Sequence, residues 1–215
     1  ALMENTRIHY RTSPYGTQAD VQALENVLQA LGEDEPGLRG NIAAAMSQAY
    51  RYGRQPAKAK EMAQRAVEIG QRLKDDRLCA EASFALGMAQ AQTLHVRETL
   101  ESWQNAVAHA RRADDLWLQG QPLTRLPHIL TSLGRLDEAE AIAHEAGELI
   151  GTTQDWGSYS LTLSTLVCLA VARGDFVTAE RHAQETMLMV SRSRYPWGGS
   201  RALFALACAR ATVSA

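Results

Sequence analysis

The eight-residue segment Leu-Gly-Arg-Leu-Asp-Glu-Ala-Glu at 133–140 has an echo 40 residues later. The later segment, at 173–180, reads Arg-Gly-Asp-Phe-Val-Thr-Ala-Glu and shares the Gly, the Ala and the last Glu with the first. Steps of 40 residues join the seventh position of both copies to two earlier positions, which gives the column Ala59, Thr99, Ala139 and Ala179. A fixed period of this length is typical of stacked helix pairs, because a single pair cannot bury its apolar face alone.

Other positions keep the same register. Four residues after that column stand Ala63, Trp103, Ala143 and Ala183. Thirteen residues before it stand Met46, Leu86, Leu126 and Leu166. Small residues recur where helices approach closely, and apolar residues recur where helices interlock. The glycine of the turn is less regular, because Arg54 and Leu94 stand where the later copies have Gly134 and Gly174.

The pattern predicts an all-α, right-handed superhelical solenoid of antiparallel helix pairs. Residues 1–16 show no clear period, and we interpret them as a linker or irregular segment. Residues 17–215 are expected to form a single repeat domain. Its predicted parts are an unpaired helix at 17–31, helix pairs at about 38–73, 78–112, 115–150 and 157–191, and a final helix at 199–212.

The final predicted helix is unusually apolar for the end of a repeat array, since it carries Leu203, Phe204, Leu206 and Cys208. Natural arrays usually end in helices with a polar outer face. We therefore expect the chain to be a segment of a longer protein.

Composition excludes several classes of function. The formal net charge is −2, which gives no electrostatic case for nucleic acid or an anionic membrane. No apolar run is long enough to span a bilayer, and three cysteines do not indicate a disulfide framework, so we expect a reducing, cytoplasmic location. The six histidines form no catalytic triad and no HExxH motif, and no phosphate-binding loop is present. We expect no catalytic residue, no metal and no cofactor.

The repeats resemble tetratricopeptide repeats. The residues that carry the resemblance are Leu86, Gly87, Thr99, Trp103 and Ala106 in one copy and Gly134, Leu136, Ala139 and Ala146 in the next. The period is longer than the family's usual one of about 34 residues. This longer form has acidic and Arg-rich joints at 72–76 and 111–115. It is similar to the C-terminal helical arrays of large ATP-binding bacterial regulators, namely LuxR-type activators and related cyclase–ATPase proteins.

That resemblance implies a function without catalysis. In such regulators the array senses a small effector or a partner protein and controls an ATPase module elsewhere in the chain. We therefore expect a protein- or effector-binding module, the sensor or interaction segment of a larger bacterial signalling or transcription regulator. The alternative is a free-standing scaffold that binds an extended peptide of a partner protein.

The first helices of the pairs are expected to line the concave side, where a ligand would bind. Phe84 and Met88 would form an apolar floor, and Gln92, Gln121 and Arg125 a hydrogen-bonding rim. His128 would lie beside a bend at Pro127. The other interpretation is an ordinary solvated face with a few half-buried apolar residues.

Two features of the third pair and of the helix starts allow two interpretations each. Pro122 and Pro127 should break the first helix of the third pair, which either opens the layer near Arg125 and His128 or is a harmless kink. Tryptophans recur near the starts of successive first helices: Trp117, Trp156 and Trp197. They either form an aromatic strip that grips a partner or cover the joints between repeats.

A metal site among Cys168, Cys208 and His128 is not expected. Neighbouring helices pack about 8–10 Å apart, so side chains one repeat apart cannot readily share one ion. The same spacing argues against a disulfide between Cys168 and Cys208.

Overall fold

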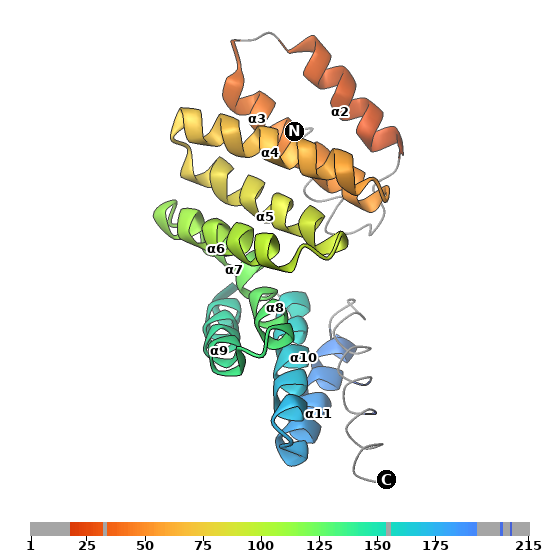
Figure 1. Ribbon diagram of the computed structural model, residues 1–215, viewed down its shortest axis with the longest axis vertical. Coiled ribbons are helices and arrows are strands. Elements are labelled where there is room, and N and C mark those ends of the chain that lie inside the picture. Colours follow the sequence, from red (N-terminus) through yellow and green to blue (C-terminus); the bar gives the residue numbers. More distant parts are fainter. Residues whose placement is uncertain (1–17, 32–33, 154–155, 193–202, 204–206, 208–215) are drawn as a thin grey trace. The chain divides into compact units, whose positions relative to one another are not determined.

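The computed structural model describes residues 18–31, 34–153, 156–192, 203 and 207. All regular structure within these residues is helical, and they contain no strand (Figure 1). The predicted linker at 1–16 and most of the predicted helix at 199–212 lie outside the described residues.

The described helices agree with the predicted pairs to within a few residues. They are α2 (Gln18–Ala30), α3 (Pro36–Tyr52), α4 (Pro56–Leu73), α5 (Asp76–Gln92), α6 (Val96–Arg112), α7 (Leu116–Leu123), α8 (Leu126–Ser132), α9 (Leu136–Thr153), α10 (Trp156–Ala172) and α11 (Phe176–Arg192). Consecutive helices pack as antiparallel pairs, which confirms the all-α repeat fold. The right-handed superhelix stays a prediction.

The chain divides into two compact units, unit 1 (residues 1–118) and unit 2 (residues 119–215). The division falls inside α7, and each unit contains helix pairs of its own. That residues 17–215 act as a single domain stays a prediction.

The helices of a pair have different neighbours, and we call the first helix of each pair an A helix and the second a B helix. In unit 1, α4 packs against both α3 and α5, and α3 also contacts α5. In unit 2, α9 packs against both α8 and α10, and α8 also contacts α10. Each of these B helices therefore lies against two successive A helices, and the A helices form a layer in each unit.

Burial confirms the 40-residue register. The exposed fraction is 0% at each member of the marker column, Ala59, Thr99, Ala139 and Ala179. Four residues further on, it is 0% at Ala63, 4% at Trp103, 0% at Ala143 and 2% at Ala183. Each B helix thus buries the same stripe of small residues against the A helices, and one tryptophan interrupts the stripe.

The turn from each A helix to its B helix has one conformation in all four pairs. The residue at the glycine position has a positive φ throughout: 56° at Arg54, 60° at Leu94, 73° at Gly134 and 74° at Gly174. The left-handed region costs an L-residue roughly 1–2 kcal/mol, and glycine escapes that cost because it has no Cβ. The backbone conformation of the turn is therefore the same in all four pairs, although glycine stands at this position in only two of them.

This conformation predicts that Leu94→Gly will stabilise the protein. Leu94 is 83% exposed, so its side chain contributes little packing that could be lost. We expect a gain of about 0.5–1 kcal/mol, measured as a higher urea midpoint. The control is Leu133→Gly, which changes another exposed leucine whose φ is −90° and should give no gain. An unchanged or lower midpoint in Leu94→Gly would contradict the strained turn.

Candidate functional site: the A-helix layer

Two side-chain columns of the A helices, each with a spacing of 40 residues, are half-buried in every pair. One column consists of Asn41, Glu81, Gln121 and Leu161, and the other of Gln48, Met88, His128 and Cys168. A third column, which contains the predicted Phe84, is half-buried at Phe84 and buried at Ala44, Thr124 and Ser164. The A layer therefore presents polar and apolar atoms together, without a continuous apolar surface.

In unit 1 the structure brings together the predicted residues of α5. Trp103 of α6 makes two contacts with Phe84. The two rings stack with centroids 6.4 Å apart, and Trp103 Nε1 donates to the Phe84 carbonyl over 3.3 Å. Met88 is half-buried and Gln92 is exposed on the same helix. Gln92 Nε2 donates to the carbonyl of Arg51 at the end of α3, 3.2 Å away.

The end of α3 supplies the neighbouring part of this layer. The guanidinium of Arg51 lies over the Tyr52 ring, 4.0 Å from its centroid, and its Nε donates to Gln48 Oε1 over 3.1 Å. Stacking on an aromatic face and a fixed amide acceptor both limit the rotamers of an arginine. The α3 and α5 ends thus form one ordered polar surface, with Met88 as its half-buried apolar member.

The other three predicted residues, Gln121, Arg125 and His128, lie along the break of the third A helix, in unit 2. Helix α7 ends at Leu123 and α8 begins at Leu126, with Pro127 in its first turn, which confirms the predicted break. Arg125 N–H bonds the Pro122 carbonyl at 3.0 Å, so it no longer serves the Gln121 carbonyl as it would in a continuous helix. Side chains replace it: Arg125 Nη1 donates to that carbonyl over 2.7 Å and Thr124 Oγ1 donates over 3.0 Å.

Arg125 and His128 therefore have structural partners. Arg125 also donates to Thr124 Oγ1 over 3.1 Å, and His128 Nε2 lies 2.8 Å from Thr165 Oγ1 on α10. A change at Arg125 would remove a hydrogen-bond donor from the break as well as any contact with a ligand, so Met88 is a cleaner position for a binding test.

Several other residues singled out from the sequence receive no ligand role. Trp117 is 37% exposed, while the Trp156 side chain, Trp197 and Cys208 lie outside what the structure describes. Cys79 and Cys168 are free thiols, and burial raises the pKa of Cys79. Among the described residues, no three His, Cys, Asp or Glu side chains are grouped so that they could hold a metal ion.

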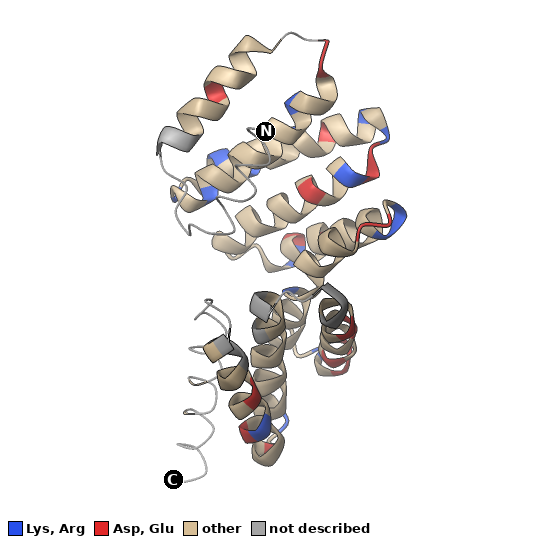
Figure 2. Cartoon of the chain, turned by 180° about the vertical axis from the view of Figure 1, so that it is seen from behind, with Lys and Arg blue, Asp and Glu red and all other residues tan. Residues whose placement is uncertain are grey.

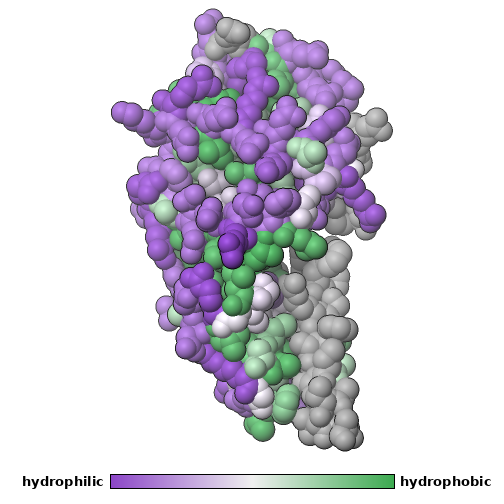
Figure 3. All heavy atoms as spheres, viewed as in Figure 1, coloured by the Kyte–Doolittle hydropathy of each residue, from purple (hydrophilic) through white to green (hydrophobic). Residues whose placement is uncertain are grey.

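The surfaces of the two units differ in polarity. Hydrophilic side chains dominate the face of unit 1 seen in Figure 3, and the visible face of unit 2 shows broader hydrophobic areas. The large apolar side chains exposed in unit 2 include Leu133, Phe176, Val177, Met187 and Leu188. No described helix is both long and apolar enough to cross a membrane.

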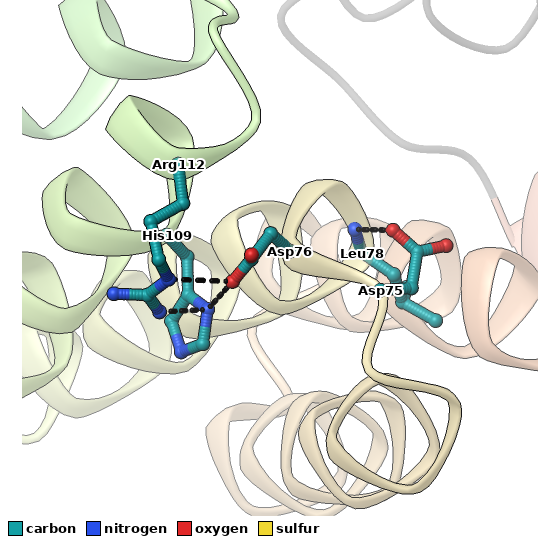
Figure 4. A network of polar contacts seen from close by, with 5 residues as sticks. All are labelled: Asp75, Asp76, Leu78, His109 and Arg112. Atoms are coloured by element: carbon teal, nitrogen blue, oxygen red, sulfur yellow. Dashed lines mark hydrogen bonds and ion pairs between the residues drawn. The ribbon is translucent and has the colours of Figure 1, made fainter.

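The edge of unit 1 where B helices lead into the next A helices is held by paired charges (Figure 4). Oδ1 of Asp76 at the start of α5 lies 2.6 Å from His109 Nδ1 and 2.9 Å from Arg112 Nε, both at the end of α6. Asp75 Oδ1 accepts the Leu78 N–H over 3.0 Å and caps α5. Two hydrogen bonds hold the pKa of Asp76 below its usual value. The bond to His109 has the larger effect, and the bond to Arg112 has the next largest.

The lowered pKa of Asp76 predicts how acid acts on this edge. A carboxyl group whose pKa is lower in the folded state stabilises the fold fully above its unfolded value, here 3.8, and loses that contribution as the pH falls through the folded value. Wild type should therefore be more stable than Asp76→Asn at pH 6, and the two urea midpoints should converge below pH 3.8. The control Asp34→Asn changes an exposed carboxylate and should keep a constant offset from wild type. A constant offset for Asp76→Asn as well would contradict the ion pair.

The sequence matches no protein-family model. A search of curated proteins finds no relative either. Solved structures, in contrast, do resemble this one. A Rap protein complexed with competence and sporulation factor has a TM-score of 0.74 at 13% identity, over 88% of this chain and 53% of that one. Aspartyl phosphate phosphatase F from Bacillus subtilis has a TM-score of 0.69 at 14% identity, over 79% of this chain and 44% of that one.

A third similar structure consists of nearly identical TPR-like repeats of a putative kinesin light chain from Podosopora anserina. Its TM-score is 0.64 at 17% identity, and the match covers 89% of this chain and 94% of that one. The chain has a tetratricopeptide-like repeat fold. At these identities the similarity establishes the fold alone. This tetratricopeptide-like chain spans about half the length of the Rap protein and of the phosphatase.

Proposed function

We propose that this chain is a non-enzymatic, protein-binding repeat module that acts in the cytoplasm as the sensor or interaction segment of a larger bacterial signalling or transcription regulator. The observation that carries the proposal is the ordered polar surface on α3 and α5. It combines Gln48, Arg51 and Gln92 with the half-buried Met88. These are groups that recognise a ligand and show no arrangement of an acid, a base and a nucleophile.

An extended peptide suits this surface better than a small ion does. Neighbouring helices are about 8–10 Å apart, so a ligand that contacts both α3 and α5 must be about 10 Å long or longer. A glutamine amide offers both a donor and an acceptor, as a peptide backbone does. Met88 adds a flexible apolar contact of the kind that adapts to different side chains.

Two further observations support the proposal. A protein of similar fold has been solved in complex with competence and sporulation factor. The charged joints between repeats resemble those of sensor arrays in large ATP-binding regulators. The alternative is a free-standing scaffold that binds an extended peptide, and it would use the same surface. An ATPase or cyclase domain encoded in the same reading frame would distinguish the regulator segment from this scaffold.

The test is a selection of random ten-residue peptides displayed on phage against the purified chain. We expect wild type to enrich peptides that no longer bind Met88→Glu. The matched control is Met187→Glu, which makes the same change at a methionine of α11 that is 40% exposed. Circular dichroism melting checks that both variants fold. Absence of enriched peptides, or equal loss in the two variants, would contradict the proposal.

A further inference from the structure

Four cations surround the turns that lead from A to B helices in unit 1, and we call them the turn edge: Arg51, Arg54, Lys58 and Arg97. Arg54, Lys58 and Arg97 are exposed, and Arg51 is half-buried. The contacts of two of them are with aromatic rings, since Arg51 lies over Tyr52 and Lys58 Nζ is 5.3 Å from the Tyr50 centroid. No carboxylate of the described residues forms an ion pair with any of the four.

The ion pairs found in the described part of unit 1 lie at the opposite edge, where Asp76 pairs with Arg112 and Arg77 lies 3.2 Å from Asp115. Figure 2 shows red and blue segments side by side at that edge, whereas blue marks the turn between α3 and α4. The cations of the turn edge thus lack the carboxylate partners that Arg77 and Arg112 have at the opposite edge.

The equivalent turns of unit 2 provide an internal comparison. There Arg135 pairs with Glu138 at 2.6 Å, and Arg173 pairs with both Asp137 and Glu140 at 2.6 Å. In the 40-residue register, Lys58 and Lys60 of unit 1 occupy the positions held by Glu138 and Glu140 in unit 2. The turn between α3 and α4 therefore carries cations where the turn between α8 and α9 carries carboxylates, whereas the turn between α5 and α6 carries Glu98 at this position.

The turn edge is continuous with the polar surface of α3 and α5. The hydrogen bond from Gln92 Nε2 to the Arg51 carbonyl joins the ends of these two helices at 3.2 Å. Beside it, Thr93 Oγ1 lies 2.7 Å from His95 Nδ1. A segment that lies along the A layer at Met88 and Gln92 would therefore run directly into Arg51 and the cations beyond it.

We propose that the turn edge docks an acidic segment of a protein partner, a specificity that rests on the proposed peptide-binding function. Carboxylates of the segment pair with Arg51, Arg54 and Lys58, and its neighbouring residues contact Met88 and Gln92. Charges of opposite sign mainly set specificity and association rate. A protein segment fits better than nucleic acid, because the chain has a net charge of −2 and nucleic acid requires a longer basic stripe.

The test compares two double variants that remove the same amount of charge from different parts of unit 1. Arg54→Gln/Lys58→Gln changes the turn edge, and Arg65→Gln/Arg72→Gln changes exposed cations elsewhere on α4. The peptides enriched by wild type in the phage selection should be rich in Asp and Glu. Fluorescence anisotropy with the best of them should show about tenfold weaker binding to the turn-edge variant, as expected for two exposed ion pairs, and less than a twofold change in the control.

Three outcomes would overturn the acidic partner while leaving peptide binding intact: enriched peptides without acidic residues, equal loss in both double variants, or unchanged binding when Gln replaces every Glu and Asp of the peptide. A single-stranded oligonucleotide of equal charge that binds as tightly as the peptide would also overturn it. If wild type enriches no peptide at all, the proposed function fails and the acidic docking site fails with it.

Discussion

Replacing Trp103 by alanine should destabilise the protein by about 3–5 kcal/mol, and replacing Gly87 by valine should destabilise it by about 1–3 kcal/mol. Trp103 is 4% exposed, and a Cβ on Gly87 would lie 2.4 Å from both Cδ1 and Nε1 of its indole. The indole occupies the space that any side chain at Gly87 would need. Removing the ring leaves a cavity, and adding side-chain atoms at Gly87 forces the ring to move.

The repeats themselves suggest the compensating change. At the equivalent positions, the other pairs combine Ser47 with Ala63, Pro127 with Ala143 and Val167 with Ala183. The double variant Gly87→Val/Trp103→Ala recreates the last combination, so it should lose less stability than the sum of the two single variants. A thermodynamic cycle from urea midpoints measures this coupling. Strictly additive losses would show that the two residues do not share one space.

Enlarging Ala139 to leucine should destabilise the protein by about 1–3 kcal/mol through overpacking. Ala139 belongs to the column whose exposed fraction is 0% in all four B helices, and the stripe lies where a B helix packs on A helices. Thermal or urea unfolding measures the effect. The matched control is Ala141→Leu, an exposed position of the same helix, which should change stability by less than about 0.5 kcal/mol. An unchanged midpoint in Ala139→Leu would mean that the column does not face a helix.

The proposed binding surface combines two kinds of residue that differ in how much side-chain freedom they lose when a ligand binds. Gln48, Arg51 and Gln92 are already held by hydrogen bonds within the chain, which lowers the entropy lost when a ligand binds. Arg54, Lys58 and Arg97 of the turn edge, in contrast, are exposed and bind an opposite charge at the cost of side-chain freedom. Binding should therefore depend on salt mainly through the turn edge.

The break at Pro122 and Pro127 was predictable from the sequence, whereas the structural partner of Arg125 was not. Two prolines five residues apart predicted an interrupted helix because each removes a backbone donor. The sequence also assigned Arg125 to the hydrogen-bonding rim of a ligand site. Its partner is the backbone carbonyl that the break itself exposes, and that geometry arises only once the helix is interrupted.

Periodicity alone determined the helix pairs, their register and the stripe of small residues, because a stacked array repeats the same burial every 40 residues. Tertiary structure decided how departures from that period are accommodated. Arg54 and Leu94 adopt the glycine conformation because the helices they connect must pack in the same way in every pair. Gly87 is small because Trp103 fills its space, and Asp76 meets Arg112 because α5 and α6 are antiparallel. Such partners lie 16 and 36 residues apart in the sequence, and their choice depends on how each helix is rotated against the next, which the period does not encode.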